Sequence, residues 1–457
     1  MRTTIGRLNS QTARLSRHPS LTCNFAVMVV LLASLLVFAT AYAAAADTTP
    51  RTTVYLGATV IDGDPTTVRK AMAVVTRGDK IIGVAPLDGF HPESTWKSVA
   101  ISGKFVIPGL INTHVHLATV ADPPAARSYL RRELYSGVTT VRDMAGDSRL
   151  LVELKREAEF DEIVAPDIYF VALFAGPDFF TDPRTHQAAR GRTAGEVPWM
   201  RAVTRDTDLR QAVAEARGSG ATAIKIYADL PAELVKAITV EAHRQNMLVW
   251  AHATVFPARP SEVVDAGVDV ISHSCLLGYE ISEPAVPAYA HRVPVGTVAT
   301  LKANPKIDAL MTHIRQRGTI LDATAYVFDS DPSPSCPAGA EDYLTQLAYK
   351  AGIPISVGTD DDLGGKSAFS DMDNEVSVLV KNVGMSAADV IRSATIIGAR
   401  TMNLEKALGT IEVGKSADFV VLNKNPLDDI DNIRTVEMVV KHGIPHRRRD
   451  FKPGSAE

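Results

Sequence analysis

Residues 106–116 read Val106-Ile107-Pro108-Gly109-Leu110-Ile111-Asn112-Thr113-His114-Val115-His116. An apolar run is broken by Pro-Gly, resumes, and ends in two histidines. Side chains two apart in a β-strand face the same side, so His114 and His116 can point into one cavity at the end of a buried strand. Neutral imidazole is a common metal ligand. Most His-x-His pairs bind nothing, so this prediction of a metal site needs support from the rest of the chain.

From Phe105 onward the chain alternates strand and helix patterns. Strands are predicted at Phe105–Val115, Val138–Arg142, Asp167–Ala172, Ala223–Tyr227, Leu248–Ala253, Val268–Ser274, Thr319–Ala325 and Ile353–Asp360. Helices are predicted at Ala125–Tyr135, Asp208–Arg217, Pro231–Gln245, Pro305–Arg317 and Asp342–Ala351. Eight strand-then-helix repeats predict an α/β fold, a (β/α)₈ TIM barrel, in which functional residues gather at the C-terminal strand ends. A doubly wound open sheet gives a similar pattern and is the alternative.

Short strands flank this region on both sides. Residues 53–107 contain two apolar runs around Arg77-Gly78-Asp79, a hairpin signal, and short strands return after Leu408. We predict a small β-sandwich built from both ends of the mature chain. The predicted domains are a signal peptide at 1–46, the N-terminal part of the sandwich at 47–107, the barrel at 108–403, and the C-terminal part with the tail at 404–457.

The first 46 residues differ from the rest. They contain four arginines and no acidic residue, followed by an uncharged stretch that ends in alanines. A basic start, an apolar centre and an A-x-A site are typical of a secretory signal peptide. We predict export to the periplasm or the medium, and the alternative is an uncleaved N-terminal membrane anchor.

Charge and cysteine usage narrow the classes of protein. The chain has 48 basic and 52 acidic residues, and loss of the four arginines leaves 44 basic residues and a net charge of −8. Without a basic cluster, nucleic acid is not an expected partner. Two cysteines, Cys275 and Cys336, remain in the mature chain, and they could form a disulfide in an oxidising compartment or stay free.

Ionisable side chains stand at the predicted C-terminal ends of several barrel strands. A single strand-end histidine is more often a hydrogen-bonded core residue, and a strand-end aspartate is more often a helix cap. The whole set is harder to explain in that way, because barrel strand ends converge on one mouth. The set consists of His114, His116, Lys225, His252, His273 and Asp360.

These residues and their surroundings resemble the amidohydrolase superfamily, and within it the imidazolonepropionase-like and prolidase-like secreted members. The resemblance covers nearly all of residues 53–445 and is specific for the superfamily rather than for a substrate. It depends on the residues already quoted at 108–116, on Gly137-Val138-Thr139-Thr140-Val141-Arg142-Asp143, on His252 and His273, on Gly358-Thr359-Asp360, and on residues 414–422.

The resemblance implies a site for two metal ions per chain, and zinc is the expected metal. His114, His116 and Asp360 would hold the more buried ion, and His252 and His273 the more exposed one. Lys225 would bridge both ions as a carbamate, because a free ammonium cannot ligate a cation. The alternative for Lys225 is an unmodified lysine that snorkels within the barrel, with one metal in the site.

The resemblance also implies a hydrolytic mechanism. A hydroxide shared by two metals would attack a polarised carbonyl, with Asp360 carrying the proton to the leaving nitrogen. Tyr227 faces the same way as Lys225 and could hydrogen-bond an oxyanion, or could simply pack. Arg184 and His186, in the loop after strand 3, could bind a substrate carboxylate, although a solvated loop is the more ordinary reading.

We therefore predict an exported metal-dependent hydrolase that cleaves an amide-type C–N bond. A dipeptide or an N-acyl amino acid is the favoured substrate, a cyclic amide or imide is second, and a lactone or other ester is third. A non-catalytic protein that binds a metal or ligand is the alternative of another class. The expected partner is a small-molecule substrate. No stable membrane insertion is expected after cleavage, and a homo-oligomer is left open.

Overall fold

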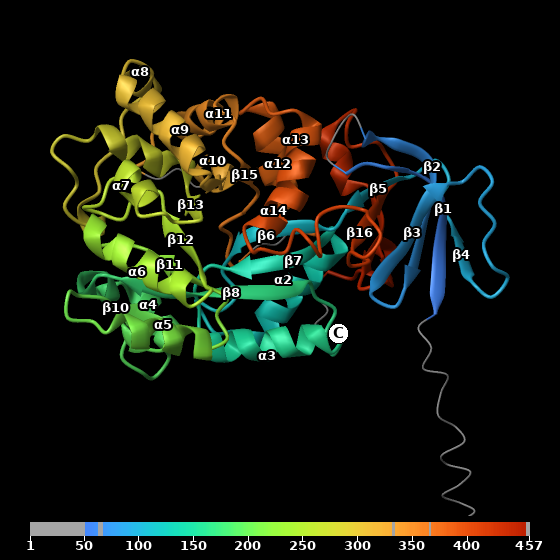
Figure 1. Ribbon diagram of the computed structural model, residues 1–457, viewed down its shortest axis with the longest axis horizontal. Coiled ribbons are helices and arrows are strands. Elements are labelled where there is room, and N and C mark those ends of the chain that lie inside the picture. The colour runs from blue at the N-terminus through green and yellow to red at the C-terminus, as the bar shows by residue number, and fades with distance from the viewer. Residues whose placement is uncertain (1–50, 63–66, 331–333, 365–366, 454–457) are drawn as a thin grey trace, which may run out of the picture. The chain divides into compact units, whose positions relative to one another are not determined.

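A barrel of eight parallel strands forms the larger part of the computed structural model, which describes residues 51–62, 67–330, 334–364 and 367–453. The predicted signal peptide lies outside the described residues. Helices lie between successive strands and cover the outside of the sheet (Figure 1). The barrel strands are β6 (Leu110–Val115), β7 (Val138–Asp143), β8 (Asp167–Ala175), β11 (Ala223–Ile226), β12 (Leu248–His252), β13 (Val270–Ser272), β14 (Ile320–Asp322) and β15 (Ile355–Ser356). The predicted (β/α)₈ barrel is confirmed.

Backbone hydrogen bonds bring the first and the last strand together. The amide of Thr113 donates to the carbonyl of Val357 at 3.0 Å, and the amide of Asp360 donates to the carbonyl of His114 at 2.9 Å. A parallel bridge joins Val115 to Asp361. This contact distinguishes the barrel from an open sheet, and it places residue 114 beside residue 360.

The helices begin where the sequence provides caps. Asp147, Asp208 and Asn304 each accept a hydrogen bond from a backbone amide of the first turn, which satisfies a donor that the helix itself leaves open. The longer helices after the barrel strands are α2 (Pro123–Tyr135), α3 (Ser148–Glu159), α5 (Leu209–Gly218), α6 (Ala232–Arg244), α9 (Pro305–Arg317), α11 (Ala340–Lys350) and α12 (Met372–Lys381). All five predicted helices agree with α2, α5, α6, α9 and α11 within two residues at each end.

The predicted first strand, Phe105–Val115, is two strands in different sheets. β5 (Phe105–Pro108) pairs antiparallel with β16 (Phe419–Leu422), whereas β6 begins the barrel. The chain crosses at Gly109, where a Cβ would lie 2.1 Å from Oγ1 of Thr139. Only glycine fits such a close approach, so the Pro-Gly break marks the change of sheet.

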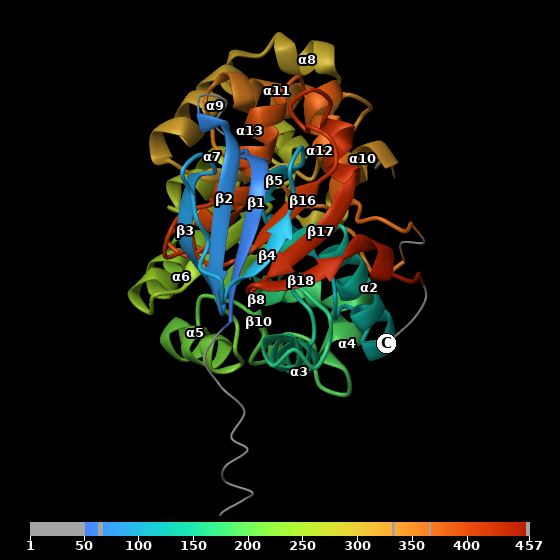
Figure 2. The ribbon, with the colours of Figure 1, turned by 90° about the vertical axis from the view of Figure 1, so that its right-hand side faces the viewer.

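Both ends of the described chain build a second, mixed sheet of eight strands. Its order is β18-β17-β16-β5-β1-β2-β3, with β4 paired to β1. Figure 2 shows the N-terminal strands, in blue, beside the C-terminal ones, in red. The remaining bounds are β1 (Thr52–Val60), β2 (Arg69–Arg77), β3 (Lys80–Pro86), β4 (Lys97–Ala100), β17 (Val436–Lys441) and β18 (Ile444–Arg447). The predicted sandwich-like domain from both ends is confirmed, with a core that includes Tyr55 against Phe419.

An ion-pair cluster joins this sheet to the start of β8. Nζ of Lys441 and Nε2 of His442 each lie 2.9 Å from a carboxylate oxygen of Asp167. The hydrogen bond to Asp167 raises the pKa of His442, whose side chain is 31% exposed. The pKa of His442 in the unfolded chain is about 6.5. Because the pKa is higher in the folded protein, the ion pair stabilises the fold fully below about pH 6.5, and this stabilisation is lost as the pH rises through the folded-state pKa.

Replacing His442 by glutamine should therefore lower the free energy of unfolding by about 1 kcal/mol at pH 6. The difference from the unaltered protein should shrink as the pH rises above the folded pKa of His442. Thermal unfolding of both proteins at pH 6 and pH 9 measures it. A difference that is equal at both pH values would contradict the assigned ion pair.

Candidate metal centre

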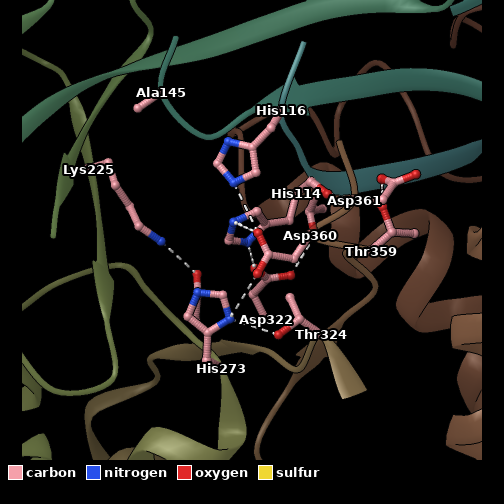
Figure 3. A network of polar contacts seen from close by, with 12 residues as sticks. His114, His116, Ala145, Lys225, His273, Asp322, Thr324, Thr359, Asp360 and Asp361 are labelled. Carbon is pink, nitrogen blue, oxygen red and sulfur yellow. Dashed lines mark hydrogen bonds and ion pairs between the residues drawn. The ribbon is translucent and has the colours of Figure 1, made fainter. Parts of the chain in front are cut away.

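Six predicted ligands from five barrel strands line one cavity of about 930 Å³. Figure 3 shows His114, His116, Lys225, His273 and Asp360 converging from four segments of the barrel. His114 lies on β6 and His116 just beyond it, Lys225 lies on β11, and His252 ends β12. His273 and Asp360 follow β13 and β15. The arrangement follows from parallel strands, which all present their C-terminal ends at one mouth.

The tightest group of donor atoms belongs to His114, His273 and Asp360. Each residue offers one atom, and these atoms lie within 4.8 Å of one another. Nε2 of His114 lies 3.1 Å from Oδ1 of Asp360, and Nε2 of His116 lies 3.0 Å from the same oxygen. The carboxylate of Asp360 is therefore shared between the two histidines of β6, as a common position for a cation would require.

Asp322, at the end of β14, orients the first histidine. Its Oδ2 lies 2.7 Å from Nδ1 of His114, and its Oδ1 accepts a hydrogen bond from the hydroxyl of Thr113 at 2.9 Å. The contact leaves Nε2 of His114 facing Asp360. A carboxylate behind a ligating imidazole fixes the tautomer and the ring orientation. Sequence reasoning missed Asp322, although it ends an apolar strand as the predicted ligands do.

Burial keeps two of the histidines neutral. It lowers the pKa of His273 to about 3 and the pKa of His252 well below its ordinary value, and the neighbouring positive groups act in the same direction. Neutral imidazole is the form that binds metals. Within the described chain, Nδ1 of His252 is buried without a hydrogen-bond partner. A buried nitrogen atom without a partner, in a cavity that also contains the carboxylate of Asp360, fits a metal site.

His114 and Asp360 behave differently from these two. Burial opposes the charged form of His114, but the carboxylates of Asp360 and Asp322 outweigh burial and raise its pKa. Burial would also raise the pKa of Asp360, but the facing histidines hold it well below its ordinary value. Asp360 is therefore an anion at neutral pH, able to ligate a cation or accept a proton.

Lys225 is enclosed by the barrel and is 1% exposed. Its Nζ donates to the hydroxyl of Ser272 at 3.2 Å. Burial lowers the pKa of this amine to about 8, against the opposing effect of Asp322 and Asp360. A minor fraction of Lys225 is thus neutral at about pH 7, larger than for an exposed lysine, and only the neutral amine can react with CO₂.

Two of the six residues have a backbone conformation that is rare outside glycine. The φ angle is 73° at His273 and 55° at Asp360. Such a conformation costs about 1–3 kcal/mol and persists where the surrounding structure holds it. The amide of His273 donates to the carbonyl of Asp322 at 2.9 Å, and Asp360 is held by its bond to His114. The strain turns both side chains into the cavity.

Of the three residues predicted to contact the substrate, two line the cavity and one does not. Tyr227 lines the same cavity, stacks on Phe179 with ring centroids 4.3 Å apart, and lies 3.9 Å from the ring of His252. Arg184 also lines the cavity, paired with Asp182. His186 lies exposed on α4 (Pro183–Ala189) and is not among the residues that line the cavity. The structure therefore brings Arg184 and Tyr227 to the site and leaves His186 outside it.

Comparison with known proteins identifies the family of this chain. Residues 105–444 match the model of the amidohydrolase family. The chain is 24% identical over 438 residues to ochratoxinase from Aspergillus niger, covering 85% of this chain and 84% of the relative. It is 25% identical over 376 residues to a probable imidazolonepropionase from Nematostella vectensis, covering 75% and 81%.

A likeness to solved structures supports the fold. A crystal structure of a Xaa-Pro dipeptidase with bound methionine superposes with a TM-score of 0.66 at 22% identity. It covers 87% of this chain and all of the dipeptidase chain. The family match extends over most of the chain and over all six strand-end residues. This protein therefore belongs to the amidohydrolase family and is an enzyme that acts on carbon–nitrogen bonds.

Proposed function

We propose that this enzyme hydrolyses the amide bond of a dipeptide or an N-acyl amino acid. The observation that carries the proposal is the position of Asp360, whose ionised carboxylate contacts both His114 and His116 and lines the open cavity. A protein that only binds a metal needs no proton acceptor at that position. Hydrolysis of an amide needs one, because amide nitrogen leaves only when it is protonated.

The donor set fits two divalent cations, and zinc is the expected metal because imidazole nitrogen and carboxylate oxygen are its ordinary ligands. His114, His116 and Asp360 would hold one ion, His252 and His273 the other, and Lys225 as a carbamate would belong to both. When bound, the metal ions supply an electrophile for the carbonyl oxygen and lower the pKa of water.

The residues of the chain itself would act on the substrate as follows. Asp360 accepts the proton of the attacking water at a carboxylate oxygen and delivers it to the leaving nitrogen. Tyr227, which burial and Tyr289 keep in its protonated form by raising its pKa, donates to the developing oxyanion. Arg184 attracts a substrate carboxylate to the cavity wall. These roles match a substrate that carries a free carboxylate near its amide bond.

A substrate screen tests this proposal. Purified protein loaded with zinc is incubated with a library of dipeptides and N-acyl amino acids, and with a smaller set of cyclic amides and lactones. Release of free amino acid from the first library is the expected result. Turnover of the cyclic amides alone would favour the second candidate, which the similarity to an imidazolonepropionase supports. Metal binding without turnover of any compound would reject the hydrolase.

Asp322 offers a test of the metal site itself. Replacing Asp322 by asparagine should weaken metal binding by about 10–100-fold, because His114 loses the carboxylate that orients its ring. Competition with a coloured chelator measures the affinity. Asp308→Asn, an exposed carboxylate on α9, is the matched control. An unchanged affinity in Asp322→Asn would remove His114 from the ligand set.

Export is the second part of the proposal. A disulfide joins Cys275 to Cys336, with Cα atoms 6.1 Å apart, and disulfides persist in oxidising compartments. Within the described ranges, no helix is both long and apolar enough to cross a bilayer. We propose that the N-terminal segment is a cleaved signal peptide. Detection of the intact, uncleaved N-terminus in exported protein, by mass spectrometry, would favour the membrane anchor instead.

A further inference from the structure

A second, smaller cavity opens off one wall of the main one. The two cavities share His116, Thr119, Met144, Arg184 and Tyr227 among their lining residues. The small cavity therefore lies beside His116, a predicted metal ligand. A substrate bound at the metal centre would have this space directly next to it.

Apolar side chains form the interior of this side pocket. Leu173, Phe179, Ala188 and Met200 line it and are at most 5% exposed. Thr185 also lines it, but its hydroxyl donates to backbone carbonyl groups of residues 180 and 182. The surface that remains for a ligand is apolar, and burying an apolar group against it is favourable.

The segment between β8 and α5 builds the pocket. Met200 begins β10 (Met200–Ala202), which pairs in parallel with the end of β8 and places Met200 opposite Leu173. Phe179 comes from the turn after β8, and Ala188 comes from α4. These residues belong to an apolar cluster separate from the main barrel core. The pocket is therefore formed by the end of β8 together with the segment between β8 and α5.

Charge is distributed unevenly around the two cavities. Arg184 lies where they meet, and the residues that line the side pocket include no carboxylate. The main cavity also has acidic lining residues that the side pocket lacks, namely Asp122, Asp361, Asp362 and Asp371. Figure 3 shows Ala145, which lines the side pocket, and Asp361 on opposite sides of Asp360. A substrate carboxylate is thus repelled from the end of the cavity that carries these four acidic residues. Where the side pocket opens it meets Arg184, a cation that is shared with Asp182.

The size of the pocket limits what it can accept. Its volume is about 50 Å³, whereas an apolar cavity that holds benzene has a volume of about 150 Å³. A small aliphatic group fits the side pocket, and a phenyl ring exceeds it.

We propose, on the basis of the function proposed above, that the side pocket selects the amino acid released by hydrolysis. The α-carboxylate of that residue would meet Arg184, and its small aliphatic side chain, as in alanine or valine, would enter the pocket. Met200, a buried lining residue of the pocket, would set the size limit.

The test compares kcat/KM for N-acetyl derivatives of glycine, alanine, valine, leucine and phenylalanine. The unaltered enzyme should prefer alanine and valine over glycine and phenylalanine by about tenfold. Met200→Ala should raise the leucine-to-alanine ratio of kcat/KM by about tenfold, because it enlarges the pocket. Ala188→Val should lower the valine-to-glycine ratio, because it fills the pocket. A ratio does not depend on the fraction of enzyme that is folded.

Met247→Ala is the matched control. Met247 is 3% exposed in the barrel core and lines neither cavity, so the same truncation there should leave every ratio unchanged. Turnover with the same ratios in Met200→Ala as in the unaltered enzyme would overturn the side pocket and leave the proposed function standing. A preference of the unaltered enzyme for N-acetylphenylalanine would also overturn the side pocket and leave the proposed function standing. No turnover of any derivative or dipeptide would overturn both.

Discussion

Replacing Asp360 by asparagine should reduce kcat by about 10²–10⁴-fold on the substrate that the screen identifies. The amide has nearly the same shape as the carboxylate, but it cannot accept a proton from the attacking water. It also cannot return a proton to the leaving nitrogen. The effect should fall on kcat rather than KM, because the lost interaction belongs to the transition state.

Metal content has to be measured on the same sample, because Asp360 is also a predicted ligand. Assays at saturating zinc separate loss of the proton carrier from loss of the ion. Asp206→Asn, an exposed carboxylate in the loop before α5, is the control and should keep full activity. Unaltered turnover in Asp360→Asn would remove the assigned role and leave the residue as a ligand alone.

Replacing Lys225 by alanine should lower the metal content from two ions per chain towards one, with a large loss of kcat. The reason is chemical: a carbamate on Lys225 would be an anionic ligand shared by both ions, and alanine cannot form it. Elemental analysis of the purified variant, against the unaltered protein, measures the change. A small carboxylic acid such as acetate should restore part of the activity, because it can occupy the space of the carbamate.

Lys236→Ala is the matched control for this variant, since Lys236 is exposed on α6. It should keep both the metal content and the activity. A metal content that is the same in Lys225→Ala as in the unaltered protein would reject the bridging carbamate. An unaltered protein that already holds one ion would reject the two-metal site and support an unmodified Lys225.

The barrel could be predicted because each of its strands can be recognised from its own short stretch of sequence. A buried parallel strand is a short apolar run, and each of the eight runs was visible between helical patterns. The ligand types were visible for the same reason: a strand shows which residue stands at its end. The crossing at Gly109 was not predicted, because the apolar pattern is the same on both sides of it while the two halves pair with different partners.

The sequence by itself determined which strands form, the side to which His114 and His116 both face, and the family to which the chain belongs. These depend on the alternation of neighbouring residues along a strand. Only the tertiary structure decided that Asp322 stands behind His114, that Cys275 reaches Cys336, and that Leu173 and Met200 enclose a pocket. Each of these contacts joins residues from different elements of the fold, and the packing of those elements, rather than any local pattern, sets the distance between them.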